Sequence, residues 1–135
     1  MAIFSFHPVK MITTGEGGAI TTNDQELDYR LSLLRTHGIT KDASKFINES
    51  HGAWYYEQHA LGFNYRLTDI QAALGLSQLK RLDSFIKRRK EIADFYLNNL
   101  KNVSLPYQHP DIQSTWHLFV VQVSDREEVF NKLLK

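Results

Sequence analysis

A single lysine near the start of the chain has the clearest potential for chemistry. Lys10 follows an apolar run that is typical of a buried strand and precedes a glycine-rich turn, Gly15–Gly18. If apolar side chains and glycine backbone enclose it, the amine is desolvated, which lowers its pKa and makes it a nucleophile toward a carbonyl carbon. Ser5 lies in the same run and offers a hydroxyl to an anion. The same residues are also consistent with a solvated lysine beside an ordinary hairpin turn. The residues alone therefore leave both the catalytic and the ordinary interpretation open.

Composition and the remaining motifs argue against several other functions. The sequence has no His-Glu-x-x-His, Gly-x-Ser-x-Gly or Walker motif, and His51 and His59 are interpreted as ordinary loop histidines rather than metal ligands. Zero cysteines exclude disulfides and cysteine catalysis, and they fit a cytoplasmic protein. A net charge of +1 argues against nucleic-acid binding by bulk electrostatics, and no apolar run is long enough to span a membrane.

Two strands and a helix must position the lysine. Residues 2–6 and 19–22 have the aromatic and β-branched character of short strands, with the turn between them. Pro8 ends the first strand, because proline has no N–H to give to a sheet. A helix follows, with N-cap oxygens, leucines at helical spacing and a closing glycine at Asn23, Asp24, Leu27, Leu31, Leu34 and Gly38. Lys10 is therefore expected just after the first strand.

Residues 39–66, which we call the aromatic loop, show no clear period. The loop contains Trp54, Tyr55, Tyr56, Phe63 and Tyr65. So many aromatic side chains argue against disorder, and a structureless loop of this length is uncommon unless it is functional. We therefore expect a loop without regular structure that packs on, or reaches into, something else.

Helices and one more strand are expected in the second half of the chain. A helical pattern runs from Thr68, its expected N-cap, to Leu100, with a break near Leu82 because few globular helices are so long. Small residues in its first part leave room for a neighbouring segment: Ala72, Ala73 and Gly75. Trp116–Val123 is the strongest predicted strand, and Asp125 caps a last helix. This order of strands and helices indicates an α/β fold.

Longer strings of residues go beyond these local patterns. They are Ser5-Phe6-His7-Pro8-Val9-Lys10, Ile12–Ile20, Leu34–Gly38, Leu61–Ala73, Gln78-Leu79 with Leu82, and Trp116–Phe119. Together they closely resemble the lysine segment and the following motifs of the sugar aminotransferases of the DegT/StrS type, over nearly the whole chain. Members of that family are pyridoxal-phosphate (PLP) enzymes with the aspartate-aminotransferase, or type I, fold. The resemblance therefore implies this α/β fold and PLP as the cofactor.

The resemblance also implies roles for four residues. Lys10 matches the lysine that forms the internal aldimine with the cofactor and then shuttles the substrate proton. Ser5 matches a hydroxyl that binds the cofactor phosphate. Asn64 matches a side chain that reaches the phosphate of the neighbouring subunit's cofactor, and Arg66 lies in the same motif, so the aromatic loop is expected to cross the interface of a homodimer. A strand hydroxyl at Ser5, a turn cap at Asn64 and an ordinary ion pair at Arg66 remain the alternatives.

The resemblance indicates the reaction as well. Related dehydratases carry His where the aminotransferases carry Lys, so Lys10 favours transamination. The strings at 7–10, 54–56 and 85–89 most resemble the branch that transaminates a UDP-linked 4-keto-6-deoxy sugar on the way to pseudaminic acid. The implied substrates are a nucleotide-linked keto sugar and an amino-acid donor, for which glutamate is usual in the family.

The resemblance divides the chain into parts of two domains. Residues 1–82 match the C-terminal part of a large PLP-binding domain, and residues 83–135 match the N-terminal part of a small domain that is incomplete. In the family, an acid for the pyridine nitrogen, a ring over the cofactor and a glycine-rich phosphate loop precede the lysine strand, whereas only Met1 and Ala2 precede Ile3 here. We therefore expect a fragment that is inactive by itself. The alternative is a non-catalytic module that folds or dimerises through the aromatic loop.

Overall fold

The predicted lysine segment connects the two strands of an antiparallel hairpin. A computed structural model describes residues 1–134, and Lys135, the last residue expected for the small domain, lies outside them. Strand β1 (Ala2–Ser5) pairs along its whole length with β2 (Gly18–Thr21). Both expected strands are confirmed within one residue of their predicted bounds.

Helix α1 (Gln25–Leu34) follows the hairpin. Its N-cap is Asp24, as expected, and Asp24 Oδ1 accepts the backbone N–H groups of Glu26 and Leu27, both at 3.0 Å. Beyond the helix end, Gly38 adopts a φ of +73° and donates its N–H to the Leu33 carbonyl at 2.8 Å. Gly38 therefore supplies the left-handed residue that the sequence predicts after this helix.

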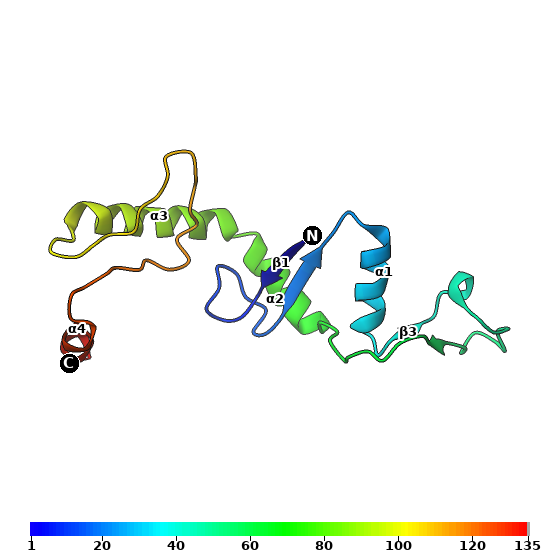
Figure 1. Ribbon diagram of the computed structural model, residues 1–135. Helices are drawn as coiled ribbons and strands as arrows, with labels where there is room; N and C mark the ends of the chain where they lie inside the picture. Colours follow the sequence, from blue (N-terminus) through cyan, green and yellow to red (C-terminus); the bar gives the residue numbers. More distant parts are fainter. Residues whose placement is uncertain (135) are drawn as a thin grey trace.

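The expectation that the aromatic loop lacks regular structure is wrong in part. Strands β3 (Ile39–Thr40) and β4 (Glu57–Gln58) pair antiparallel, and the short 3-10 helix η1 (Ala43–Lys45) lies between them. Strands of two residues leave no recognisable period in a sequence, so the pattern misses them. The loop forms a small hairpin, which lies at the opposite end of the molecule from α4 (Arg126–Leu133) (Figure 1).

Two glycines lie where the chain enters and leaves this small hairpin. A Cβ at Gly38 would overlap the carbonyl oxygen of Ala60, and a Cβ at Gly62 would overlap the backbone nitrogen of Gly38. Backbone therefore lies directly on backbone, which only glycine permits. This Gly38–Gly62 crossing brings the residues before Asn64 against the end of α1.

The expected long helical pattern divides into two helices. Helix α2 (Asp69–Leu79) begins with a capping box, in which Thr68 and Gln71 exchange backbone-to-side-chain hydrogen bonds. Thr68 is thus confirmed as the N-cap. The chain turns before α3 (Leu82–Asn99), which confirms the expected break (Figure 1).

The strand expected at Trp116–Val123 does not form. Gln122 and Ser104 exchange two backbone hydrogen bonds, of 3.0 and 2.9 Å, in an isolated bridge, and Trp116 has a φ of +52°, outside the β region. A ladder needs a second strand along its length, and residues 1–134 place none beside this segment. Arg89 of α3 holds it instead, donating from Nη1 to the carbonyl oxygens of Trp116 at 3.2 Å and His117 at 3.4 Å.

The last helix and the buried residues complete the fold. Asp125 caps α4 as expected, accepting the N–H of Glu128 at 2.8 Å. Among residues 1–134 the buried apolar side chains are Leu33 and Ala93, whereas Leu61 is 91% exposed. The chain is α/β, as predicted, and no helix in its described part is long and apolar enough to cross a membrane. The division into residues 1–82 and 83–135 stays a prediction.

Candidate functional site

Lys10 lies in the connection between β1 and β2, residues 6–17, which we call the lysine loop. Its backbone N–H donates to the His7 carbonyl at 2.9 Å and closes a tight turn. The residue is partly buried. Within residues 1–134 its amine has no hydrogen bond or ion pair, so the amine is available to react, although the enclosure expected from the sequence is only partial.

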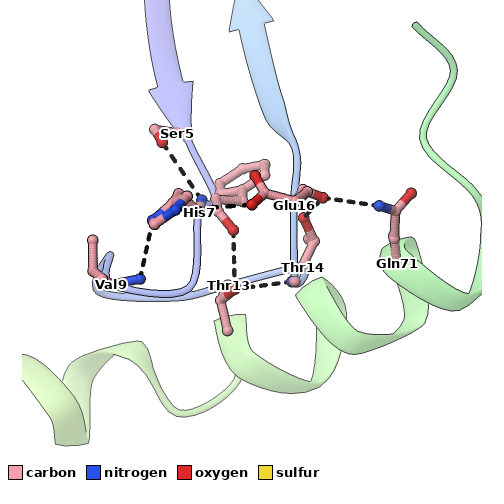
Figure 2. Close-up of polar contacts among 9 residues, drawn as sticks. Ser5, His7, Val9, Thr13, Thr14, Glu16 and Gln71 are labelled. Carbon is pink, nitrogen blue, oxygen red and sulfur yellow. Dashed lines mark hydrogen bonds and ion pairs between the residues drawn. The ribbon is translucent and has the colours of Figure 1, made fainter.

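Ser5 ends β1, directly before the lysine loop (Figure 2). Its Oγ accepts the N–H of His7 at 3.5 Å, a long hydrogen bond. The residue is exposed. Its hydroxyl proton can therefore be donated to an anion that approaches the loop.

A buried threonine that sequence reasoning missed organises the lysine loop. Thr14 is 4% exposed. Its N–H donates to the Phe6 carbonyl at 3.0 Å, and its Oγ1 donates to the Glu16 carbonyl at 2.7 Å. The Oγ1 of Thr13 donates to the same Phe6 carbonyl at 3.0 Å (Figure 2). These bonds tie the two ends of the loop together.

Helix α2 holds the lysine loop from outside. Gly75 leaves space on the helix for Thr14, since a Cβ at Gly75 would lie 2.8 Å from Thr14 Cγ2. The expectation that small residues of this helix admit a neighbouring segment is thus confirmed at Gly75. Gln71 adds a polar contact, because its Nε2 donates to the Glu16 carbonyl at 3.0 Å (Figure 2).

Asn64 and Arg66 lie together in one shallow concavity. Its lining also includes Leu67, Thr68 and Asp69. The backbone here is fixed: Asn64 forms a bridge with Thr36, and the N–H of Tyr65 donates to the Arg35 carbonyl at 2.9 Å. Both side chains are exposed. An amide and a guanidinium at one open concavity suit a phosphate group.

The four predicted site residues thus form two pairs. Ser5 and Lys10 share the β1–β2 hairpin, and Asn64 and Arg66 share the concavity. Within residues 1–134 no hydrogen bond or ion pair joins one pair to the other. An amine, a hydroxyl, an amide and a guanidinium are the groups that an aldehyde and a phosphate require. The donor set therefore fits a phosphorylated aldehyde such as PLP.

The aromatic loop contains a second polar centre that sequence reasoning missed. The Glu57 side chain, 6% exposed, accepts the backbone N–H groups of Ile47 at 2.7 Å and Asn48 at 2.8 Å. It also accepts the Tyr55 hydroxyl at 2.9 Å and lies 2.7 Å from Nε2 of His59. Positions 55, 57 and 59 alternate and so share one face of an extended chain. That alternation is the signal by which the sequence could have shown the cluster.

Hydrogen bonds decide how this centre titrates. Burial raises the pKa of Glu57, but the bonds from His59, Ile47 and Asn48 outweigh burial and hold its pKa far below the ordinary value of 4.5. Burial and the bond to the Glu57 carboxylate raise the pKa of the Tyr55 phenol above 10.0. Glu57 is therefore an ionised, well-partnered carboxylate that orders the loop. In residues 1–134 no group of three or more His, Cys, Asp or Glu side chains could hold a metal ion.

Comparison with known sequences extends these observations. The model of the DegT/DnrJ/EryC1/StrS aminotransferase family matches residues 1–135. The spore coat polysaccharide biosynthesis protein SpsC of Bacillus subtilis is 43% identical over 127 residues, which cover 92% of this chain and 32% of that protein. The UDP-4-amino-4,6-dideoxy-N-acetyl-beta-L-altrosamine transaminase of Campylobacter jejuni is 48% identical over 96 residues, which cover 71% of this chain and 23% of that enzyme.

Solved structures show the same relationship. The PLP form of a Streptococcus pneumoniae protein assigned as a sugar aminotransferase superimposes with a TM-score of 0.80 at 30% identity. The match covers 98% of this chain and 34% of that protein. The chain thus has the fold of one part of such a protein and spans about a third of the length of the relatives it matches.

Proposed function

The chain belongs to the DegT/DnrJ/EryC1/StrS aminotransferase family, and from this premise we propose that it forms the lysine-bearing part of a PLP-dependent sugar aminotransferase. The proposed reaction moves an amino group from glutamate to a nucleotide-linked 4-keto-6-deoxy sugar. The observation that carries the proposal is Lys10, whose amine is unpaired within residues 1–134 and lies on a loop that Thr14 and α2 hold in place. We assign the activity to a protein of the relatives' length and expect the 135 residues alone to be inactive.

In this proposal Lys10 carries out the proton transfers. PLP, when bound, supplies the electron sink for the carbon that bears the amine. The amine of Lys10 would hold the cofactor and, when free, would take and return the proton of the amine-bearing carbon. The tight turn between His7 and Lys10 restricts the positions of this base, which reduces the entropy cost of the transfer.

We assign phosphate binding to the other three residues. Ser5 donates its hydroxyl to the phosphate of the cofactor that Lys10 binds. Asn64 and Arg66 bind the cofactor phosphate of a second copy, which makes the protein a homodimer. The open concavity supports this assignment, because its lining contains neither Ser5 nor Lys10 and its exposed Asn64 and Arg66 can serve another chain.

The acceptor class rests on a relative. The Campylobacter jejuni transaminase is named for a UDP-linked amino sugar. We propose an acceptor of the same kind for this family member, the UDP-linked 4-keto-6-deoxy sugar that leads to pseudaminic acid. We also predict that glutamate is the amino donor and that the protein is cytoplasmic.

Exchange of Lys10 tests the proposal. In the protein that carries these residues, supplied with PLP, glutamate and UDP-linked 4-keto sugars, Lys10→Ala should lower the formation of 2-oxoglutarate and amino sugar by about 10²- to 10⁴-fold. Lys41→Ala, which removes an exposed lysine of the same chain, should leave the rate unchanged. If the unchanged protein forms neither product with any such acceptor, the aminotransferase proposal is wrong.

A non-catalytic docking module is the second candidate, and one observation favours it. Trp54 of the aromatic loop is 77% exposed and Leu61 is 91% exposed, as in a surface that another chain covers. If Lys10→Ala leaves every property unchanged while Trp54→Ala abolishes self-association in sedimentation experiments, the docking function replaces the enzymatic one.

A further inference from the structure

The side-chain amide of Gln71 makes contacts at both of its ends. Its Oε1 accepts the backbone N–H of Thr68 at 3.0 Å and lies 3.0 Å from the Thr68 hydroxyl, which donates to it. Its Nε2 donates to the carbonyl oxygen of Glu16 at 3.0 Å. Strand β2, helix α1 and the aromatic loop all lie between Glu16 and Gln71 in the sequence. One planar group thus connects two segments that are distant in the chain.

Each end of the amide fixes one half of the candidate site. Thr68 follows Arg66 closely and shares the concavity with Asn64 and Arg66. Glu16 lies in the lysine loop, where its carbonyl oxygen also accepts the hydroxyl of Thr14. The oxygen end therefore holds the segment with Asn64 and Arg66, and the nitrogen end holds the lysine loop through the Glu16 carbonyl (Figure 2).

The nitrogen end has no substitute among the described residues. The other hydrogen bonds of the lysine loop lie within the hairpin itself, from Thr13, Thr14, Phe6 and Lys10. Within residues 1–134, Gln71 is the residue outside the hairpin that donates a hydrogen bond to this loop. The contact between Thr14 and Gly75 adds van der Waals packing, which does not fix the orientation of the loop as a hydrogen bond does. The orientation of the loop on α2 therefore depends on one amide N–H.

We propose that Gln71 is a positioning residue that sets the Lys10 loop relative to the Asn64–Arg66 segment. The inference rests on the proposed function of Lys10. Gln71 does not contact the reacting atoms; it acts through the Glu16 carbonyl on one side and the Thr68 N-cap on the other. A shift of the loop moves the amine of Lys10, whereas a shift of the cap moves the concavity.

Two substitutions separate the ends of the amide. Gln71→Glu keeps an oxygen for the Thr68 N–H and suits the first turn of a helix, but it removes the N–H donor and places a carboxylate against the Glu16 carbonyl. Gln71→Leu removes both ends. Amide hydrogen exchange of Lys10 and Thr14 reports on the loop, and exchange of Tyr65 and Ala72 reports on the cap and its flank.

The expected result is asymmetric. Gln71→Glu should speed exchange of Lys10 and Thr14 about tenfold, as loss of one hydrogen bond predicts, and leave Tyr65 and Ala72 within twofold of the unchanged protein. Gln71→Leu should speed exchange at all four positions. The proposal is overturned if Gln71→Glu leaves the loop within twofold. It is also overturned if Gln71→Glu loosens Ala72 as much as Thr14, since Gln71 would then act on the helix alone.

Lysine labelling gives the second readout. The protein that carries these residues is incubated with PLP, reduced with cyanoborohydride and mapped by peptide mass spectrometry. Lys10 should label faster than the exposed Lys41, and Gln71→Glu should slow labelling at Lys10 about three- to tenfold while Lys41 is unchanged. If the unchanged protein shows no preference for Lys10, the proposed function fails, and amide exchange still decides the role of Gln71. If Lys10 is preferred equally in both proteins, the positioning role fails and the function stands.

Discussion

The lysine loop and the aromatic loop are each organised around one buried polar side chain, but the two side chains differ in charge. Thr14, 4% exposed, is neutral and donates one hydroxyl to a carbonyl. Glu57, 7% exposed, is ionised and accepts from several donors. The first arrangement does not titrate, whereas the second depends on pH. The same chain therefore holds its lysine loop with a pH-independent contact and its aromatic loop with a charge.

The difference also predicts how each loop fails. Removing the Thr14 hydroxyl takes away one of two donors to the Glu16 carbonyl, which keeps its hydrogen bond from Gln71 of α2. Removing the Glu57 charge leaves the N–H groups of Ile47 and Asn48 facing a group that cannot accept from all of them. Partly buried donors that lose their acceptor cost more than a lost neutral hydrogen bond. We therefore expect the aromatic loop to be the more fragile of the two.

The largest effect is expected for Glu57→Gln. In either orientation the new amide points an N–H at a backbone N–H, so amide exchange of Ile47 and Asn48 should rise between about tenfold and a hundredfold. Exchange of Thr14 should not change. Glu49→Gln removes the same charge from an exposed position in the same loop and should have no effect. Equal effects of the two variants would show that the loss of charge, and not of the Glu57 hydrogen bonds, is responsible.

Acid should reproduce part of this effect without mutation. The folded pKa of Glu57 is depressed, so its contribution to stability is complete above the ordinary value of 4.5 and is lost as the pH falls toward the folded value. After correction for intrinsic exchange rates, Ile47 should exchange faster at pH 3 than at pH 6, whereas Thr14 should not. Glu57→Gln should remove this pH difference at Ile47. A difference that survives in Glu57→Gln would assign the acid sensitivity to another group.

A packing experiment tests the neutral contact in the lysine loop. Gly75→Ala should lower the free energy of unfolding by about 1 kcal/mol, because overpacking against Thr14 outweighs the gain in helix propensity. In a Thr14→Ser background the methyl group is gone, and the same change should raise the free energy by about 1 kcal/mol. Denaturant titration of the four proteins of this cycle measures both values. Additive effects would contradict direct packing between the two residues.

The smallest effect is expected at an exposed ion pair on α3. Arg88 and Glu91 lie 2.9 Å apart, with side chains 71% and 49% exposed. Arg88→Gln should change the free energy of unfolding by less than about 0.5 kcal/mol. This change in free energy is the reference for an exposed charge, with which the effects of substitutions in the two loops are compared. A larger loss would mean that charge alone, without burial, stabilises this chain.

Local sequence signals correctly predicted the helix boundaries that depend on one capping residue. Asp24, Thr68 and Asp125 each cap a helix as expected, because a cap depends on a side chain and the next few backbone N–H groups. The break before Leu82 follows from helix length alone. These features need no knowledge of distant parts of the chain.

Features that need distant partners could not be predicted in this way. Trp116–Val123 has the composition of a strand, but a strand is formed by its neighbours, and here Arg89 and one bridge replace a ladder. The contact between Gln71 and Glu16 spans much of the chain, so no local pattern contains it. The turn beside Lys10 and Ser5 singles them out as candidates, whereas Asn64 and Arg66 become candidates only through family resemblance; all four stay predictions.

The Gly38–Gly62 crossing has a practical consequence for engineering. The crossing brings the two ends of the small hairpin together through backbone contact, where Gly38 meets Ala60 and Gly62. Residues 41–56 can be exchanged as a cassette only for a loop that again supplies donors to Glu57, because Ile47, Asn48 and Tyr55 lie among them. The two glycines themselves set the limits of that cassette, because any side chain at either position would force the strands of the joint apart.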